Sequence, residues 1–268
     1  MRILAGNLFA IYRRELQGYF GSPFSYAIAG VFWLITGIFF LVILQSLLQQ
    51  VANYDLQAQF GGGANLPPID VATLFVQSFL GSVGIIVLIV MPMLSMGLYT
   101  EERKRGTLEL LATSPITNWG VATGKLLAVL TFVIGMILPI MLYEAIAFSA
   151  ASPPLPFTVF LAAHAGLVLL AASVLSLGMF ISSLTESTVL AAILTFVLVL
   201  LLWILQGIGD TIGGPIGEGL NYLSLLRHYT TLTEGVLDLG SFVVFASYIF
   251  LGIFLTAQTI ETLRFQRS

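Results

Sequence analysis

The sequence has 268 residues, of which 58% are hydrophobic and only 9% are charged, with a mean hydropathy of +1.01 and a formal net charge of −3. This composition excludes a soluble globular domain, because so few polar side chains cannot cover the surface of one. The absence of cysteine excludes disulfides, iron–sulfur clusters and cysteine-ligated zinc. Backbone groups in lipid must be satisfied within the segment, and the long apolar runs lack the alternation of barrel strands. The sequence therefore predicts an all-α membrane protein.

Six segments are long and apolar enough to cross a membrane, since a helical span needs roughly 20 residues. We place them at about 22–50, 71–99, 119–147, 157–181, 188–207 and 241–260. Ser152-Pro153-Pro154-Leu155-Pro156 ends the third span, because proline lacks the N–H that a helix needs. The six spans are expected to form one membrane domain over residues 1–268.

The basic residues divide unequally between the two sides that these spans define. Nine of the ten fall on one side and only Arg227 falls on the other; the nine are Arg2, Arg13, Arg14, Arg103, Lys104, Arg105, Lys125, Arg264 and Arg267. The positive-inside rule then places both termini and the loop at 100–118 in the cytoplasm, with 208–240 facing outward.

The first twenty residues repeat apolar side chains at helical spacing, with Arg13, Arg14 and Gln17 elsewhere around the axis. This pattern is typical of an amphipathic helix over residues 1–20 that lies on the membrane surface, although a simple topological anchor would also satisfy it. No charge-free core precedes residue 15, so the segment is not a cleavable signal peptide.

The charged segment from Glu101 to Ile116 interrupts the spans. Pairs four residues apart, Glu101 with Arg105 and Arg105 with Glu109, favour a cytoplasmic helix. Pro115 ends it before the third span begins. A charged loop that serves only topology and solvation is the alternative.

The order of residues in this segment, from the charged cluster through Gly-Thr-Leu-Glu to Thr-Ser-Pro, resembles the signature of type 2 ABC exporter permeases. Two further stretches resemble the gliding-motility type of these permeases. They are Tyr12-Arg13-Arg14-Glu15-Leu16 with Tyr19-Phe20-Gly21-Ser22-Pro23, and Tyr222-Leu223-Ser224 with His228, Gly235 and Asp238. The resemblance covers most of the chain, and it implies six spans with both termini inside a bacterial inner membrane.

The resemblance also implies that this chain is not an enzyme and binds no cofactor, because ATP and Mg²⁺ belong to a separate ATP-binding subunit. A phosphate-binding loop would need G-x-x-x-x-G-K-[ST], but Leu126 follows Gly124-Lys125 and Trp119 replaces the first glycine. The expected partners are that subunit, a second permease copy or a related permease, and membrane lipid; no nucleic acid is expected.

The resemblance assigns ATPase coupling to the charged segment and a second contact to the N-terminal helix. The coupling residues are Glu101, Glu102, Arg103, Arg105, Gly106, Thr107, Glu109, Leu111, Thr113, Ser114 and Pro115. The N-terminal contacts are Arg13, Arg14 and Glu15. The second and fifth spans are expected to line the substrate path, near Met91, Met96, Thr195 and Phe196.

Two other classes of protein remain as alternatives. An ion-coupled carrier should show inverted repeats and mid-membrane acidic groups, and neither is evident. An intramembrane aspartyl protease needs two facing aspartates, but Asp55 and Asp210 sit at or beyond the outer ends of the first and fifth spans.

Several isolated features have both a structural and a functional interpretation. Residues 208–240 are expected to form an outer re-entrant or interfacial segment. At its start the glycine-rich run 207–219 favours a turn over a re-entrant feature, and short helices at the outer interface are expected over 220–239. Glu144 is expected to reach the interface, and His164 to make an interhelical hydrogen bond rather than bind a ligand. Gly120 and Gly124 are spaced for close helix packing.

Overall fold

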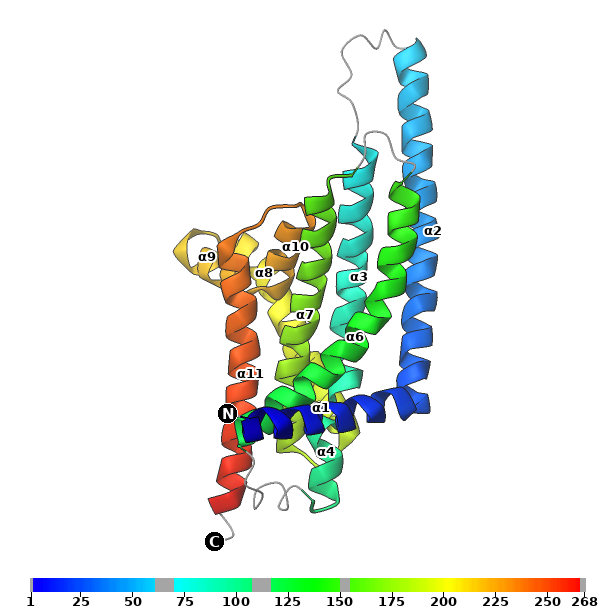
Figure 1. Cartoon of the computed structure of the whole chain (residues 1–268). Coiled ribbons are helices and arrows are strands. Elements are labelled where there is room, and N and C mark those ends of the chain that lie inside the picture. Colours follow the sequence, from blue (N-terminus) through cyan, green and yellow to red (C-terminus); the bar gives the residue numbers. More distant parts are fainter. Residues whose placement is uncertain (1, 61–69, 108–116, 150–154, 266–268) are drawn as a thin grey trace.

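A computed structural model describes residues 2–60, 70–107, 117–149 and 155–265, and these form helices without any strand. The helices are α1 (Arg2–Gly21), α2 (Pro23–Phe60), α3 (Val71–Ser95), α4 (Gly97–Lys104), α6 (Asn118–Phe148), α7 (Phe157–Leu184), α8 (Thr188–Ile212), α9 (Gly214–Leu223), α10 (Leu225–Thr233) and α11 (Leu239–Phe265). They stand as an upright bundle with α1 lying across one end (Figure 1).

The prediction of six membrane-capable helices is confirmed. They span Pro23–Phe60, Val71–Lys104, Asn118–Phe148, Phe157–Leu184, Thr188–Ile212 and Leu239–Thr262. The second runs beyond its predicted end because α4 continues α3 after a one-residue break at Met96. The chain is an all-helical, multi-pass membrane protein.

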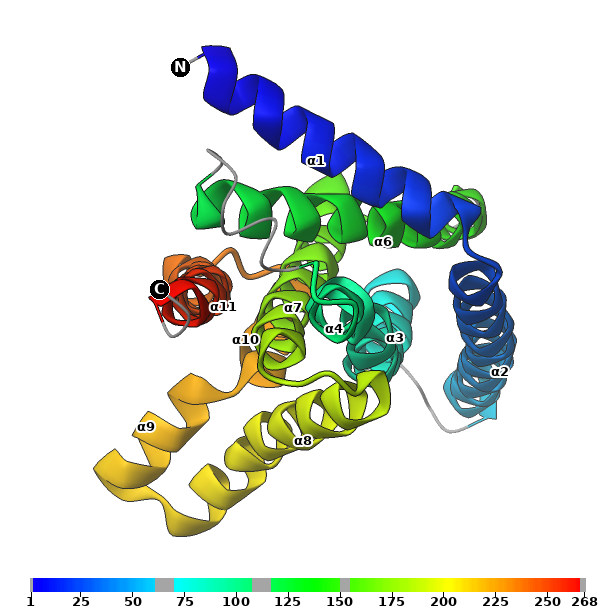
Figure 2. The same cartoon turned by 90° about the horizontal axis from the view of Figure 1, so that it is seen from below.

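The N-terminal helix lies roughly perpendicular to the spans and packs along α6 (Figure 2). A sharp elbow at Ser22 separates it from α2, whose first residue is Pro23, a residue suited to the first turn of a helix. Tyr12 donates a hydrogen bond to Thr131 across the α1–α6 contact. A Cβ added at Gly124 would lie 3.1 Å from Ile11, so this glycine lets α1 and α6 approach closely.

Helix α7 lies at the centre of the bundle when it is viewed along the spans (Figure 2). Its small residues admit close neighbours, as membrane helices require when no hydrophobic force drives them together. The hydroxyls of Ser173 and Ser176 share their protons between carbonyls of α7 itself and the more distant carbonyls of Phe245 and Tyr248 on α11, at 3.4 Å and 3.2 Å. A Cβ at Gly178 would meet Ser95 and Thr195, so α3 and α8 also contact α7 closely.

The glycine-rich run forms helices rather than the turn interpreted from sequence. Helix α8 continues to Ile212 and α9 begins at Gly214, and only Gly213 and Gly214 adopt positive φ, 63° and 64°. A short helix is present within 220–239, as expected: α10 packs against α7 and α3. Its Tyr229 is fully buried, fills the space beside Gly84, and donates a 2.7 Å hydrogen bond to the Leu80 carbonyl. Glycine on α3 therefore makes room for α10.

The residues between Tyr222 and Asp238 that resemble the gliding-motility permeases connect α9, α10 and α11. Ser224 caps α10, and the His228 ring contacts Ser241 at 3.0 Å and the Tyr222 carbonyl at 2.9 Å. Asp238 accepts backbone hydrogen bonds from Gly240 and Ser241 at the start of α11, and these bonds lower the pKa of its carboxyl. This part of the motif has a structural role.

A buried pair of side chains, Glu144 and His164, joins α6 to α7. His164 Nε2 lies 2.9 Å from Glu144 Oε2, and the Glu144 side chain is fully buried, so it does not reach the interface as expected. His164 Nδ1–H donates to the Phe160 carbonyl at 2.8 Å, which fixes the ring. A proton must then lie between Nε2 and Oε2, because two bare acceptors would repel each other. The interhelical hydrogen bond predicted for His164 is confirmed.

Replacing Glu144 with Gln and with Leu should separate hydrogen bonding from charge. The Gln amide still donates to His164 Nε2, so Glu144→Gln should change the free energy of unfolding by less than about 1 kcal/mol. Glu144→Leu leaves a buried ring nitrogen without a partner and should cost about 1–3 kcal/mol. Thermal unfolding in one detergent measures both. Equal losses for the two variants would show that the pair acts as an ion pair.

Candidate functional site

Charged side chains gather at the end of the bundle where α1, α4 and the start of α6 meet. Six of the seven Lys and Arg side chains that the structure describes lie there, and Arg227 on α10 lies at the other end. We call this end the basic end. The N-terminus and the last residues of α11 also lie at this end (Figure 1).

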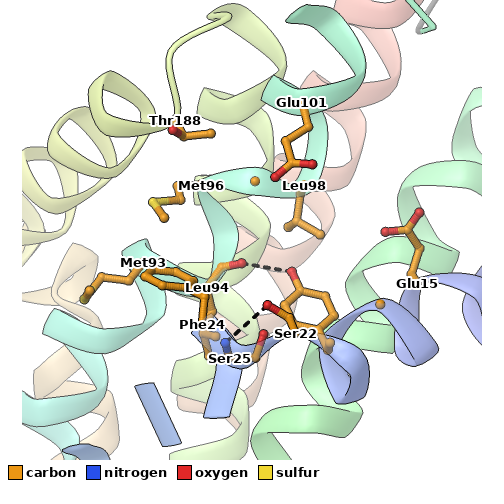
Figure 3. Close-up of a pocket in the computed structure, with 13 residues that line it drawn as sticks. Glu15, Ser22, Phe24, Ser25, Met93, Leu94, Met96, Leu98, Glu101 and Thr188 are labelled. Atoms are coloured by element: carbon orange, nitrogen blue, oxygen red, sulfur yellow. Dashed lines mark hydrogen bonds between the residues drawn. The ribbon is translucent and has the colours of Figure 1, made fainter. Parts of the chain in front are cut away.

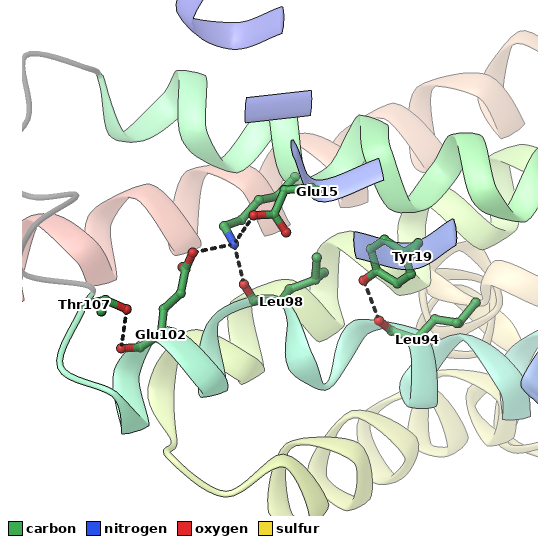
Figure 4. Close-up of polar contacts among 7 residues, drawn as sticks. Glu15, Tyr19, Leu94, Leu98, Glu102 and Thr107 are labelled. Atoms are coloured by element: carbon green, nitrogen blue, oxygen red, sulfur yellow. Dashed lines mark hydrogen bonds and ion pairs between the residues drawn. The ribbon is translucent and has the colours of Figure 1, made fainter. Parts of the chain in front are cut away.

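Lys125 on α6 is the centre of the basic end, and its side chain is only 3% exposed. Its Nζ donates to Glu15 Oε1 at 3.1 Å, to Glu102 Oε1 at 3.0 Å and to the Leu98 carbonyl at 2.8 Å (Figure 4). The ammonium also lies 4.9 Å from the centroid of the Tyr99 ring. All three donor hydrogens are used. We call this cluster of Lys125, Glu15, Glu102, Leu98 and Tyr99 the Lys125 junction.

The junction connects three elements that are far apart in the sequence, since Glu15 belongs to α1, Glu102 to α4 and Lys125 to α6. Two carboxylates share one ammonium in this cluster. The adjacent Tyr19 of α1 donates a 2.9 Å hydrogen bond to the Leu94 carbonyl of α3 (Figure 4). Polar contacts therefore join the second span and its α4 extension to both α1 and α6.

Arg103 connects α4 to the end of α7 and to the turn between α7 and α8. Its Nη1 donates to the Ser183 carbonyl at 2.6 Å, and its Nε lies 4.0 Å from Glu186. The carbonyl bond satisfies one of the last acceptors of α7. Arg103 thus ties the end of the second span to the turn between the fourth and fifth.

Helix α4 ends at Lys104 in a Schellman motif, so the helix that begins before Glu101 does not continue past Lys104; Glu109 lies outside the described residues. Gly106, at φ 68°, donates to the Arg103 carbonyl and Thr107 donates to the Glu102 carbonyl. Glycine is needed there because its positive φ strains any residue with a Cβ. The Glu101–Arg105 pair is present at 3.7 Å and is well exposed.

The predicted coupling residues fall into described and undescribed groups. Glu101, Glu102, Arg103, Arg105, Gly106 and Thr107 lie together at the basic end. Glu109, Leu111, Thr113, Ser114 and Pro115 lie outside the described residues. Of the N-terminal contacts, Glu15 joins the Lys125 junction, whereas Arg13 and Arg14 are exposed.

The four residues predicted near a substrate path have different surroundings. Met91 and Thr195 are fully buried inside the subunit, and Phe196 is exposed on α8. Met96 lines a groove of about 500 Å³ at the basic end, between the α1–α2 elbow, the α3–α4 break and the start of α8. Their role in a path stays a prediction.

A second cleft, of about 740 Å³, adjoins this groove on the side of the α7–α8 turn. Its charged lining residues are Glu101, Lys104, Arg105 and Glu186, with Ser187 and Thr188 between them. Charges of both signs face solvent here, which suits a protein surface better than a small apolar ligand.

Sequence reasoning missed the central residue of the site. Lys125 was interpreted only as a marker of topology, because a lone lysine near the end of a span usually is one. One signal was available: Glu15 and Glu102 both occur in predicted charged contacts near the same membrane face, and a lysine at that depth needs partners.

The sequence model of the family described as ABC-2 family transporter protein matches residues 28–268. The chain belongs to this family. The permease is thus the membrane component of an ABC transporter, a family role that implies an ATP-binding partner subunit. A search of curated proteins found no match. The matched region begins within α2, so α1 and its Glu15 lie before it.

Membership of the family argues against the aspartyl protease alternative, and so does the structure. The α8–α9 turn beside Asp210 and the far end of α2, which holds Asp55, lie on opposite sides of the bundle (Figures 1 and 2). Asp210 accepts a hydrogen bond from Asn221 instead.

Proposed function

We propose that the chain is the permease of an ATP-driven exporter, most like the gliding-motility type, with its basic end in the cytoplasm of a bacterial cell. A separate ATP-binding subunit docks on the basic end, two permeases assemble around one path, and this chain binds neither ATP nor Mg²⁺. The distribution of Lys and Arg supports the orientation. The Lys125 junction is the observation that carries the coupling proposal.

Coupling requires an element of the permease that has two conformations, one of which the ATP-binding subunit binds more tightly. A partner with equal affinity for both conformations would not shift the equilibrium between them. Helix α4 has the required connections, since Glu102 reaches α1 and α6 while Arg103 reaches the α7–α8 turn. Exposed Lys104 and Arg105 project beside these anchors and line the charged cleft. The partner is expected to hold the exposed charges, and the buried contacts convey the resulting movement.

Reversing one exposed charge should weaken docking and leave the fold intact. Arg105→Glu is expected to lower the ATPase rate of the purified complex at least about fivefold, because it removes one charge from the contact and introduces its opposite. Its unfolding temperature should hardly change, since exposed pairs contribute about 0–1 kcal/mol. The readouts are co-purification with the ATP-binding subunit and ATPase activity in lipid.

Arg227→Glu is the matched control, because Arg227 is equally an exposed arginine but lies at the opposite end. It should leave the ATPase rate of the complex unchanged. The proposal fails if no ATP-binding subunit associates with the wild-type chain in lipid, or if the two variants lower the rate equally.

A further inference from the structure

The groove at the elbow has an amphipathic lining, and Glu15 and Glu101 are the only predicted coupling or N-terminal contact residues among the described residues that line it. Apolar side chains of Phe24, Met93 and Met96 form part of its wall, and Phe24 and Met93 are 48% and 41% exposed. The carboxylates of Glu15 and Glu101 and the hydroxyls of Ser22 and Thr188 are among its polar lining groups (Figure 3). Apolar and acidic surfaces therefore meet in one groove.

The charge of the groove has one sign. Among the described residues that line it, none is Lys, Arg or His. Lys125 contacts Glu15 through Oε1 only, and Glu15 Oε2 has no hydrogen-bond donor in the described part of the chain. The Lys125 junction behind this wall contains two carboxylates for one ammonium group.

Glu101 supplies the second carboxylate, on the opposite wall. Its side chain is directed into the groove beside Met96 and Leu98 (Figure 3). Its pairing with Arg105 is exposed and 3.7 Å long, so an incoming cation competes with it at little cost. The groove thus offers carboxylates on two sides of an apolar floor.

The size and position of the groove restrict what can occupy it. A volume of about 500 Å³ lies within the range of small-molecule sites. It lies at the end of the apolar spans, because its lining includes residues of the elbow between α1 and α2 and of the start of α8. Methionines suit such a site because their unbranched side chains adapt to ligands of different shapes.

We propose that this groove binds a monocationic amphiphile, with an alkyl or aryl body against Phe24, Met93 and Met96 and an ammonium group between Glu15 and Glu101. This inference rests on the proposed transport function, in that it names the chemical class of substrate received at the basic end. Met96, predicted from sequence to lie near the path, is then a contact in the receiving site.

The test compares two probes of equal chain length on the permease in nanodiscs of zwitterionic lipid, without the ATP-binding subunit. One is a fluorescent alkylammonium and the other is the corresponding uncharged alcohol. The ammonium should bind at least about tenfold more tightly, since its charge is the difference that the carboxylates recognise. Equal affinities would overturn the proposal, because they would indicate apolar partitioning alone.

Two variants place the binding in this groove. Met96→Lys introduces a cation and should weaken ammonium binding at least about tenfold. It should weaken alcohol binding much less, because the uncharged probe loses an apolar contact but meets no charge repulsion. Glu101→Gln should weaken it about two- to fivefold, the range of an exposed ion pair. Glu218→Gln, an exposed carboxylate on α9, is the control and should change neither affinity. Unchanged ammonium binding in Met96→Lys would place the site elsewhere.

This experiment separates failure of the inference from failure of the proposed function. Probe binding needs no ATP-binding subunit, so a permease that recruits the subunit but does not distinguish the probes would refute the groove alone. A permease that binds ammonium selectively but recruits no subunit would refute ATP coupling alone.

Discussion

Lys125→Met is expected to destabilise the permease by about 3 kcal/mol. Removing one partner from a buried ion pair costs about 3–5 kcal/mol, and the lower end applies because Glu15 and Glu102 remain 19% and 16% exposed. The methionine keeps the apolar stem of the lysine and removes only its charge. The two carboxylates, formerly held together by the ammonium, would then repel each other, and the Leu98 carbonyl would lose its donor.

Thermal unfolding in one detergent measures the loss, and Lys104→Met is the matched control. Lys104 lies on the same face but is exposed and forms no ion pair with the described residues, so its replacement should change stability by less than about 0.5 kcal/mol. Adding Glu102→Gln to Lys125→Met should restore part of the stability by relieving the repulsion. Similar unfolding temperatures for Lys125→Met and Lys104→Met would contradict the junction.

The same variant tests coupling when the ATP-binding subunit is present. If α4 transmits movement through the junction, Lys125→Met should still recruit the subunit, because the exposed docking charges remain in place. The response of ATPase activity to transported ligand should be lost. Arg105→Glu should show the reverse, with poor recruitment, so the two variants distinguish docking from transmission.

The spans could be predicted from sequence because hydropathy over about 20 residues depends on composition alone. The division of Lys and Arg likewise needs only their positions. Contacts between distant segments were not predictable in this way. The Glu144–His164 pair joins different helices, and nothing within either helix specifies the other partner.

Local chemistry also limited the prediction at the charged segment. Ion pairs at i,i+4 favour helix by only a few tenths of a kcal/mol each. Gly106 ends the helix because its left-handed conformation closes two hydrogen bonds to the last turn of α4. The opposite error occurred at residues 207–219, where glycine suggested a turn. There, Gly209 and Gly217 instead allow α8 and α9 to contact each other through their backbones.

Gly252→Val should disrupt the central helix pair. A Cβ at Gly252 of α11 would lie 2.5 Å from the Ser176 carbonyl carbon of α7, which is backbone and cannot move aside. Membrane helices associate through close packing, so separating them removes contacts along the interface. The two hydroxyl–carbonyl bonds from Ser173 and Ser176 would lengthen together. Overpacking of this kind typically costs about 1–3 kcal/mol, and the backbone contact places this variant at the upper end.

Gly37→Val on α2 is the matched control, because a Cβ there meets nothing within 4 Å. It should leave the unfolding temperature almost unchanged, whereas Gly252→Ala should fall between wild type and Gly252→Val. Thermal unfolding in detergent measures this order of unfolding temperatures, which depends on the side-chain volume at one helix contact. If Gly252→Val were as stable as Gly37→Val, α7 and α11 could not be packed as closely as described. In that case α11 would be held to the bundle mainly by the cluster of Asp238, Ser241 and His228 at the start of α11.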